Sequence, residues 1–209
     1  KRIIYYGNWV RQGRVCETIE KKGAARVMGM DYFAEMIKLA QIKEAQSPSC
    51  VEYRQMNMFD PEQLGNFYLV VAFSVISIAS TKEELLNACK TITMNLKQGG
   101  RFITVGLNPE QYPKTYPFTE KYGFKVLNKP PQKEGDSLLS SIMADGKELF
   151  FEDYYFTHDS YEWAFKTAGF REIHWHKPVI SPEGIEKYGK TFWQDFIDYQ
   201  MSIYIECVK

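Results

Sequence analysis

Gly23-Ala24-Ala25-Arg26-Val27-Met28-Gly29-Met30-Asp31 is the stretch of sequence that decides the fold. Its apolar centre, residues 27–30, lies between two segments with a helical pattern, Cys16 to Lys22 and about Ala34 to Gln46. A glycine closes the first segment, as is common at the end of a helix. We therefore predict a helix, a short buried strand and a second helix in succession, with Asp31 at the carboxyl end of the strand.

Strand and helix patterns continue to alternate outward from this stretch. Val51 to Met56 alternates like an edge strand, and Tyr68 to Phe73 is a continuous apolar run, typical of a strand buried on both faces. An amphipathic helix is expected over Lys82 to Leu96, and a Gly99-Gly100 turn precedes another buried strand at Arg101 to Val105. This alternation predicts an α/β fold in which helices cover both faces of a parallel sheet.

Residues from about 107 to 156 break this rhythm with repeated prolines and aromatic residues. Leu138 to Met143 and Glu148 to Phe156 predict a hairpin around Asp145-Gly146. The rest of the chain predicts one helix and two terminal strands, Asp159 to Ala168, Arg171 to His176 and Met201 to Val208. We expect the last strand to run antiparallel to its neighbours and to lie beside the Arg171 to His176 strand.

Composition and charge are those of an ordinary globular protein. The 209 residues suit one domain, 1–209, in which about 107–156 is an insertion; 44% are hydrophobic and 25% charged. The 26 Lys and Arg balance 26 Asp and Glu, so nucleic acid is not an expected partner. No apolar run reaches the roughly 20 residues of a membrane span, and no signal peptide is visible. Four scattered cysteines favour reduced thiols and a cytoplasmic location: Cys16, Cys50, Cys89 and Cys207.

The candidate site residues follow the strands, because an open parallel sheet binds ligands at the carboxyl ends of its strands. Asp31 there can accept both hydroxyls of a ribose, or it caps the following helix. Asn57 and Met58 suit an adenine, through a hydrogen bond to its amine and packing on its ring, or they are a turn residue beside a core methionine. Ser74 and Ser77 line the expected pocket floor, or merely end a strand.

The aromatic-rich insertion follows the strand at residues 101–105, directly above the expected pocket. It is either a lid over a flat or cationic small substrate, whose aromatic faces also favour a sulfonium, or ordinary core for the hairpin. The candidate substrate-binding residues are Ser77, Tyr112, Tyr116, Tyr122 and Tyr155.

Two other groups of polar residues are assigned no chemistry. His174 and His176 share one face of a strand but lack a third ligand with suitable spacing, so no metal site is expected. Four scattered aspartates are interpreted as turn and cap residues: Asp136, Asp145, Asp153 and Asp159.

Taken together, several segments resemble the class I S-adenosylmethionine-dependent methyltransferases. The likeness covers about residues 14–209 and is nearest to small-molecule enzymes of the ubiquinone-biosynthesis and toxoflavin types. Two pairs of segments carry it first: Gly23 to Asp31 with Glu35-Met36-Ile37, and Leu69 to Ala72 with Lys82 to Leu86. The segment Leu96-Lys97-Gln98-Gly99-Gly100-Arg101-Phe102 is similar to a family "LKPGG-F" turn. The last segment is Tyr161 to Phe170 with its Ala-Gly-Phe end.

This resemblance implies S-adenosylmethionine as cofactor and methyl transfer to a small, aromatic metabolite. It also implies a Rossmann-like, doubly wound sheet of seven strands, mostly parallel with an antiparallel last strand. Asp31 would hold the ribose, Tyr32 and Met58 would lie beside the adenine, and Asn57 would meet its amine. The cofactor-binding residues so implied are Gly13, Asp31, Tyr32, Met36, Asn57, Met58, Phe73 and Ser74. No catalytic residue is assigned.

The family's glycine-rich first motif, D-x-G-x-G-x-G, is where the sequence departs. Residues 7–13, GNWVRQG, stand at its place, where only Gly13 fits and Trp9 and Arg11 would fill the ligand's space. One explanation is a diverged, catalytically silent homologue that acts as a binding or partner protein. The other is that the sequence lacks a stretch near Gly13–Arg14 containing the central first strand. The apolar neighbouring strands favour the second, since a packed sheet does not tolerate such a hole.

Overall fold

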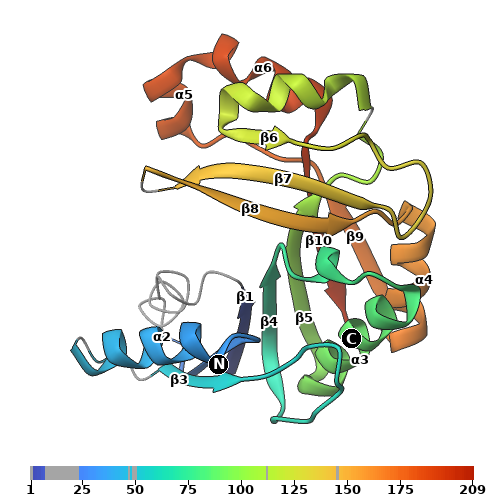
Figure 1. Cartoon of the computed structure of the whole chain (residues 1–209). Helices are drawn as coiled ribbons and strands as arrows, with labels where there is room; N and C mark the ends of the chain where they lie inside the picture. The colour runs from blue at the N-terminus through green and yellow to red at the C-terminus, as the bar shows by residue number, and fades with distance from the viewer. Residues whose placement is uncertain (1, 8–23, 47, 49–50, 112, 145) are drawn as a thin grey trace.

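Seven strands form the main sheet of the computed structural model, in the order β3-β2-β1-β4-β5-β10-β9 (Figure 1). The structure describes residues 2–7, 24–46, 48, 51–111, 113–144 and 146–209. The strands are β1 Arg2–Gly7, β2 Arg26–Asp31, β3 Val51–Gln55, β4 Phe67–Phe73, β5 Leu96–Leu107, β9 Glu172–His176 and β10 Ser202–Val208. Neighbouring strands from β3 to β5 pair in parallel, whereas β10 is antiparallel to β5 and β9. The expected α/β fold and the antiparallel last strand beside β9 are confirmed.

β1 is the central strand, and it corrects the explanation of a missing first strand. Ile3 of β1 pairs with Val27 of β2 on one side and with Leu69 of β4 on the other. The run Ile-Ile-Tyr-Tyr has the β-branched and aromatic residues typical of strands, and six residues are enough to fill the centre of the sheet. The proposed join at Gly13–Arg14 and the predicted helix from Cys16 to Lys22 lie outside the described residues.

Helices cover both faces of the sheet, because the side chains of β4 alternate between two cores. Val70 and Ala72 belong to the larger core, under α3 and α4, which span Lys82–Asn95 and His158–Ala168. Val71 belongs to the smaller core, under α2, which spans Ala34–Gln46. β4 is therefore buried on both faces, as its continuous apolar run predicts.

A second layer lies over the carboxyl ends of β4 and β5 (Figure 1). It contains an antiparallel three-stranded sheet in the order β6-β7-β8, and the predicted hairpin is confirmed as β7–β8. The elements of this layer are the 3₁₀ helix η3 Pro113–Tyr122, β6 Phe124–Val126, β7 Ser137–Ala144, β8 Lys147–Tyr154, α5 Pro182–Tyr188 and α6 Lys190–Tyr199. The third strand, β6, and the two helices α5 and α6 are not predicted from the sequence.

The expected turn at Gly99-Gly100 is wrong, since β5 runs through both residues from Leu96. The pairing of β4 with β5 changes register between Phe67 and Leu69. The two glycines lie in the stretch of β5 at this irregularity. A Cβ atom on Gly100 would lie 2.7 Å from the carbonyl oxygen of Lys97, so a side chain there would displace backbone.

Several remaining features of the described residues bear on the expectations from sequence. No helix among them is long and apolar enough to cross a membrane. Cys89 and Cys207 are buried free thiols, and burial raises the pKa of both. His174 and His176 lie on the edge strand β9, each 3.2 Å from a glutamate, and no metal-binding group of three acidic, histidine or cysteine side chains forms within the described ranges.

Glu134 ties the loop before β7 to the starts of two helices. Its carboxylate accepts hydrogen bonds from the Thr157 amide at 3.0 Å and from the hydroxyls of Thr157 and Ser160, and it pairs with Lys82 at 2.8 Å. Thr157 is also the N-cap residue of α4, and Lys82 is the first residue of α3. Burial alone would raise the pKa of Glu134, but Lys82 and the two hydroxyl residues outweigh burial and lower the pKa to about 2.

Replacing this carboxylate should destabilise the fold in a pH-dependent way. Glu134→Gln is expected to lower the free energy of unfolding by about 2 kcal/mol at pH 7, because charged hydrogen bonds are lost. Because the pKa of Glu134 is lower in the folded state, the ionised carboxylate stabilises the fold fully above pH 4.5, the ordinary pKa value. This stabilisation is lost as the pH falls toward 2. Urea unfolding at several pH values measures this, with the exposed Glu120→Gln as control. A difference that does not shrink between pH 4.5 and 2 would contradict the assignment.

Gly100 should be intolerant of a side chain. Gly100→Ala is expected to cost about 1–3 kcal/mol, because the added methyl meets the backbone carbonyl oxygens of Lys97 and Phe67. Gly106→Ala on the same strand is the control, since nothing lies within 4 Å of its added Cβ. Thermal unfolding of the two variants measures the difference, and equal stability would show that β5 shifts freely at Gly100.

Candidate cofactor and acceptor sites

Asp31 is the last residue of β2, and only one of its two carboxylate oxygens has a hydrogen-bond donor among the described residues. Its side chain is 4% exposed, and Oδ1 accepts a hydrogen bond of 2.9 Å from the Phe33 amide. Oδ2 is buried and has no partner among the described residues. Burial raises the pKa of Asp31, although the amides of Phe33 and Tyr32 oppose this shift. A buried carboxylate oxygen without a donor is costly, and a ligand hydroxyl would satisfy it.

A cavity of about 400 Å³ lies beside Asp31. The residues that line it are Met30, Asp31, Tyr32, Phe33, Met56, Asn57, Met58, Phe59, Val75, Ile78 and Glu84. Asn57 forms a turn here, since its Oδ1 accepts from the Phe59 amide at 3.1 Å and its Nδ2 donates to Asp60 at 2.9 Å. The cavity thus combines an acidic end at Asp31 with a buried apolar surface at Met58, which suits the ribose and base of a nucleoside.

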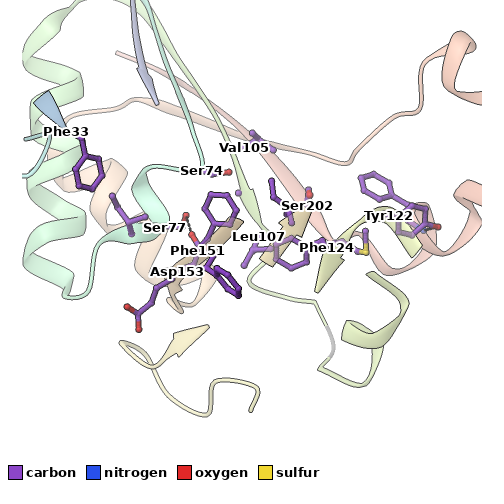
Figure 2. A pocket seen from close by; sticks show the side chains of 17 residues that line it. Phe33, Ser74, Ser77, Val105, Leu107, Tyr122, Phe124, Phe151, Asp153 and Ser202 are labelled. Carbon is purple, nitrogen blue, oxygen red and sulfur yellow. Dashed lines mark hydrogen bonds between the residues drawn. The ribbon is translucent and has the colours of Figure 1, made fainter. Parts of the chain in front are cut away.

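The end of β4 leads into a second cavity of about 450 Å³. Ser74 has a φ of 51°, in the left-handed region that a serine rarely adopts, and the short helix η2, Ile76–Ile78, follows. Ser74 and Ser77 both line this cavity, as do the aromatic rings of Phe33 and Tyr122 (Figure 2). Phe33 and Ile78 line both cavities, so the two spaces adjoin.

Asp153 corrects one interpretation from sequence. Rather than capping a turn, this residue lies on β8, and it lines the second cavity. Its Oδ1 accepts a hydrogen bond of 2.6 Å from the Ser77 hydroxyl (Figure 2). Asp136 does serve a turn, through the Gln132 and Lys133 amides, and Asp159 lies in the first turn of α4, while Asp145 is outside the described residues. The sequence carries no signal for this position of Asp153, because it depends on the contact between β8 and the segment that follows β4.

The structure brings most of the candidate residues to these cavities. Asp31, Tyr32, Asn57 and Met58 line the first cavity, and Ser74, Ser77 and Tyr122 line the second. Tyr116 and Tyr155 line a small adjoining space of about 30 Å³, together with Ser77 and Asp153.

Four other candidates lie elsewhere or are not placed. Met36 and Phe73 line neither of the two large cavities, and Phe73 packs against the core under α2, because alternation along β4 turns it to that face. Gly13 and Tyr112 lie outside the described residues. The glycine that the structure does place at the carboxyl end of β1 is Gly7, which pairs with Phe73.

The aromatic residues of the insertion form a core, and some of them also line the second cavity. Tyr122 packs between Phe192, Trp193 and Phe196, with ring centroids 5.3 to 5.5 Å apart, and its hydroxyl donates to the Phe192 carbonyl at 2.7 Å. These contacts hold α6 against η3, as a core does. Tyr122 and Phe196 also form part of the wall of the second cavity, and the role of a lid over a substrate stays a prediction.

Comparisons with known proteins agree with this geometry. Residues 10–104 match the family model of the methyltransferase domain. A search of curated proteins found no match. The fold is similar to an S-adenosylmethionine-dependent methyltransferase from Mesorhizobium loti, with a TM-score of 0.68 and 16% identity over 100% of this chain and 90% of that one.

Two further solved structures have the same fold. One is an S-adenosylmethionine-dependent methyltransferase from Clostridium acetobutylicum, with a TM-score of 0.67 and 15% identity over 99% of this chain and 83% of that one. The other is the CcbJ methyltransferase from Streptomyces caelestis, with a TM-score of 0.67 and 15% identity over 99% and 88%. The chain therefore has the fold of these S-adenosylmethionine-dependent methyltransferases, and its residues 10–104 match the family model of the methyltransferase domain.

Proposed function

We propose that this chain is a class I S-adenosylmethionine-dependent methyltransferase that methylates a small aromatic metabolite, with the cofactor in the first cavity and the acceptor in the second. The observation that supports this most directly is the pair of adjoining cavities, which meet at Phe33 and Ile78. One cavity ends at a buried carboxylate oxygen that has no partner within the described ranges, and the other is bounded by aromatic rings (Figure 2). A cofactor placed along the first cavity would point its reacting end toward the second.

Different residues of the first cavity would bind different parts of the cofactor. Asp31 Oδ2 would accept a ribose hydroxyl, since the part of the chain that the structure describes offers this buried oxygen no donor. Met58 would pack on the adenine, with Asn57 and Tyr32 at its edge. Ser74, at the end of β4, would lie near the methionine end, where the two cavities adjoin.

Positioning of the acceptor would provide most of the catalysis. When bound, S-adenosylmethionine supplies a methyl group on a sulfonium that is already activated for transfer. The chain's part is to exclude water and to orient the acceptor. Ser77 and Tyr122 line the wall on which the acceptor would rest, and the hairpin β7–β8 covers it (Figure 1).

Neutralising Asp31 should weaken cofactor binding without weakening the fold. Asp31→Asn keeps an acceptor for the Phe33 amide but removes the charged partner of the ribose, worth about 1.5–3 kcal/mol, or about 10- to 150-fold in Kd. A raised folded-state pKa means that the ionised carboxylate costs stability at pH 7, so the unfolding temperature should stay the same or rise. Calorimetric titration with adenosylhomocysteine measures Kd, with the exposed Glu35→Gln in α2 as control. An unchanged Kd would remove Asp31 from the site.

Adenosylhomocysteine should also stabilise the protein. At 100 times its Kd it is expected to raise the free energy of unfolding by about 2.7 kcal/mol, because it binds only the folded chain. Thermal unfolding with and without the ligand checks this. A chain that binds the ligand but transfers no labelled methyl group to any acceptor would support the alternative of a catalytically silent homologue. A chain that does not bind it would contradict the proposed function.

A further inference from the structure

Asp153 presents a partly satisfied carboxylate to the second cavity. It belongs to β8 in the second sheet, whereas Ser77 follows β4 in the main sheet, so their hydrogen bond of 2.6 Å joins the two layers (Figure 2). Within the described part of the chain, this is the only hydrogen bond to the Asp153 side chain, and it uses Oδ1. The other oxygen, Oδ2, is left for a ligand.

The surroundings of Asp153 are apolar and carry negative charge only. Ser77 is itself 5% exposed, and aromatic rings line the cavity, among them Phe124 and Phe151. Of the described residues that line this cavity, the charged ones are Glu152 and Asp153. Burial raises the pKa of Asp153, and the Ser77 hydroxyl only partly opposes this shift. A ligand that donates a hydrogen bond would favour the ionised carboxylate, whereas a second anion would meet repulsion in a low dielectric.

We propose that the acceptor is a flat, apolar molecule with a hydroxyl or amino group, and that this group donates its hydrogen to Asp153 Oδ2. This assignment rests on the proposed function, because it places the acceptor in the second cavity. In the transfer, the acceptor oxygen or nitrogen forms a bond to the methyl carbon, and the carbon–sulfur bond breaks with its electron pair left on sulfur. The proton of the acceptor passes to Asp153. Ser77 holds the carboxylate through Oδ1, which fixes the position of Oδ2.

The first test compares two ligands that differ only in the group offered to Asp153. Calorimetry of the adenosylhomocysteine complex with 2-naphthol and 2-naphthoate should show at least tenfold tighter binding of the naphthol, because naphthoate brings a like charge next to Asp153. In Asp153→Asn the preference should fall below about twofold. Asp159→Asn, at a fully exposed site on α4, should keep the preference of the unchanged protein. Equal binding of the two compounds to the unchanged protein, or binding of neither, would overturn the proposal whether or not the variant folds.

The second test follows the proton. Transfer of a labelled methyl group from S-adenosylmethionine to 2-naphthol should be at least about 100-fold slower in Asp153→Asn, since a positioned base contributes that much or more. A variant as fast as the unchanged protein, or no transfer in the unchanged protein, would overturn the proton role. Adenosylhomocysteine binding is measured first in every sample. Loss of that binding contradicts the proposed function, whereas normal binding without naphthol preference contradicts only the acceptor assignment.

Discussion

The parallel pairing of β1 with both β2 and β4 is the constraint on which the site depends. In parallel strands the carboxyl ends meet at one edge of the sheet, and here Tyr6 of β1 is level with Met30 and with Ala72. Asp31 and Ser74 are therefore brought to the same edge on either side of Gly7, although they are far apart in sequence. This placement makes the two cavities adjoin, because each begins where one of these strands ends.

The second layer covers part of that edge. A sheet edge alone would leave the ends of β4 and β5 open to water, but the hairpin β7–β8 lies across them (Figure 1). The layer is attached by side-chain contacts of different kinds. Ser77 donates to Asp153 between the sheets, and Glu134 holds the loop before β7 to α3 and α4. Since the acceptor would lie between the layers, the same contacts that hold the second layer also shape the acceptor cavity.

Local sequence patterns predicted the elements of the main sheet better than they predicted its centre. The continuous apolar run of β4 identified a strand buried on both faces, and the Asp145-Gly146 turn signal identified the hairpin β7–β8. β1 was not predicted because the residues that follow it do not match the family's glycine-rich motif. This motif is what usually marks the strand before it. The helix α6 packs on Tyr122 of η3, and α5 packs on α6. The apolar residues of α6 recur at helical spacing, but this pattern was not used to predict a helix.

The candidate site was predictable only where strand ends determine it. Asp31, Asn57 and Ser74 follow strands, so topology alone places them near one edge. Asp153 was not found, since its role depends on the crossing of two sheets that share no sequence signal. Asp31 Oδ1 accepts a hydrogen bond from the Phe33 amide just before α2, whereas Oδ2 has no partner among the described residues, so the ribose role stays a prediction. A capping pattern in sequence therefore does not exclude a ligand on the second oxygen.

Three buried or partly buried carboxylates show how structural and binding roles differ physically. Glu134 has donors for its charge from Lys82 and two hydroxyl residues, and its pKa is lowered to about 2. Asp31 and Asp153 each have one oxygen bound within the protein, and burial raises the pKa of both. A fully partnered carboxylate stabilises the fold, whereas a half-partnered one costs stability until something else donates to it. The two aspartates with raised pKa both line the adjoining cavities, so a cofactor and an acceptor bound as proposed could donate to the carboxylate oxygens that have no donor among the described residues.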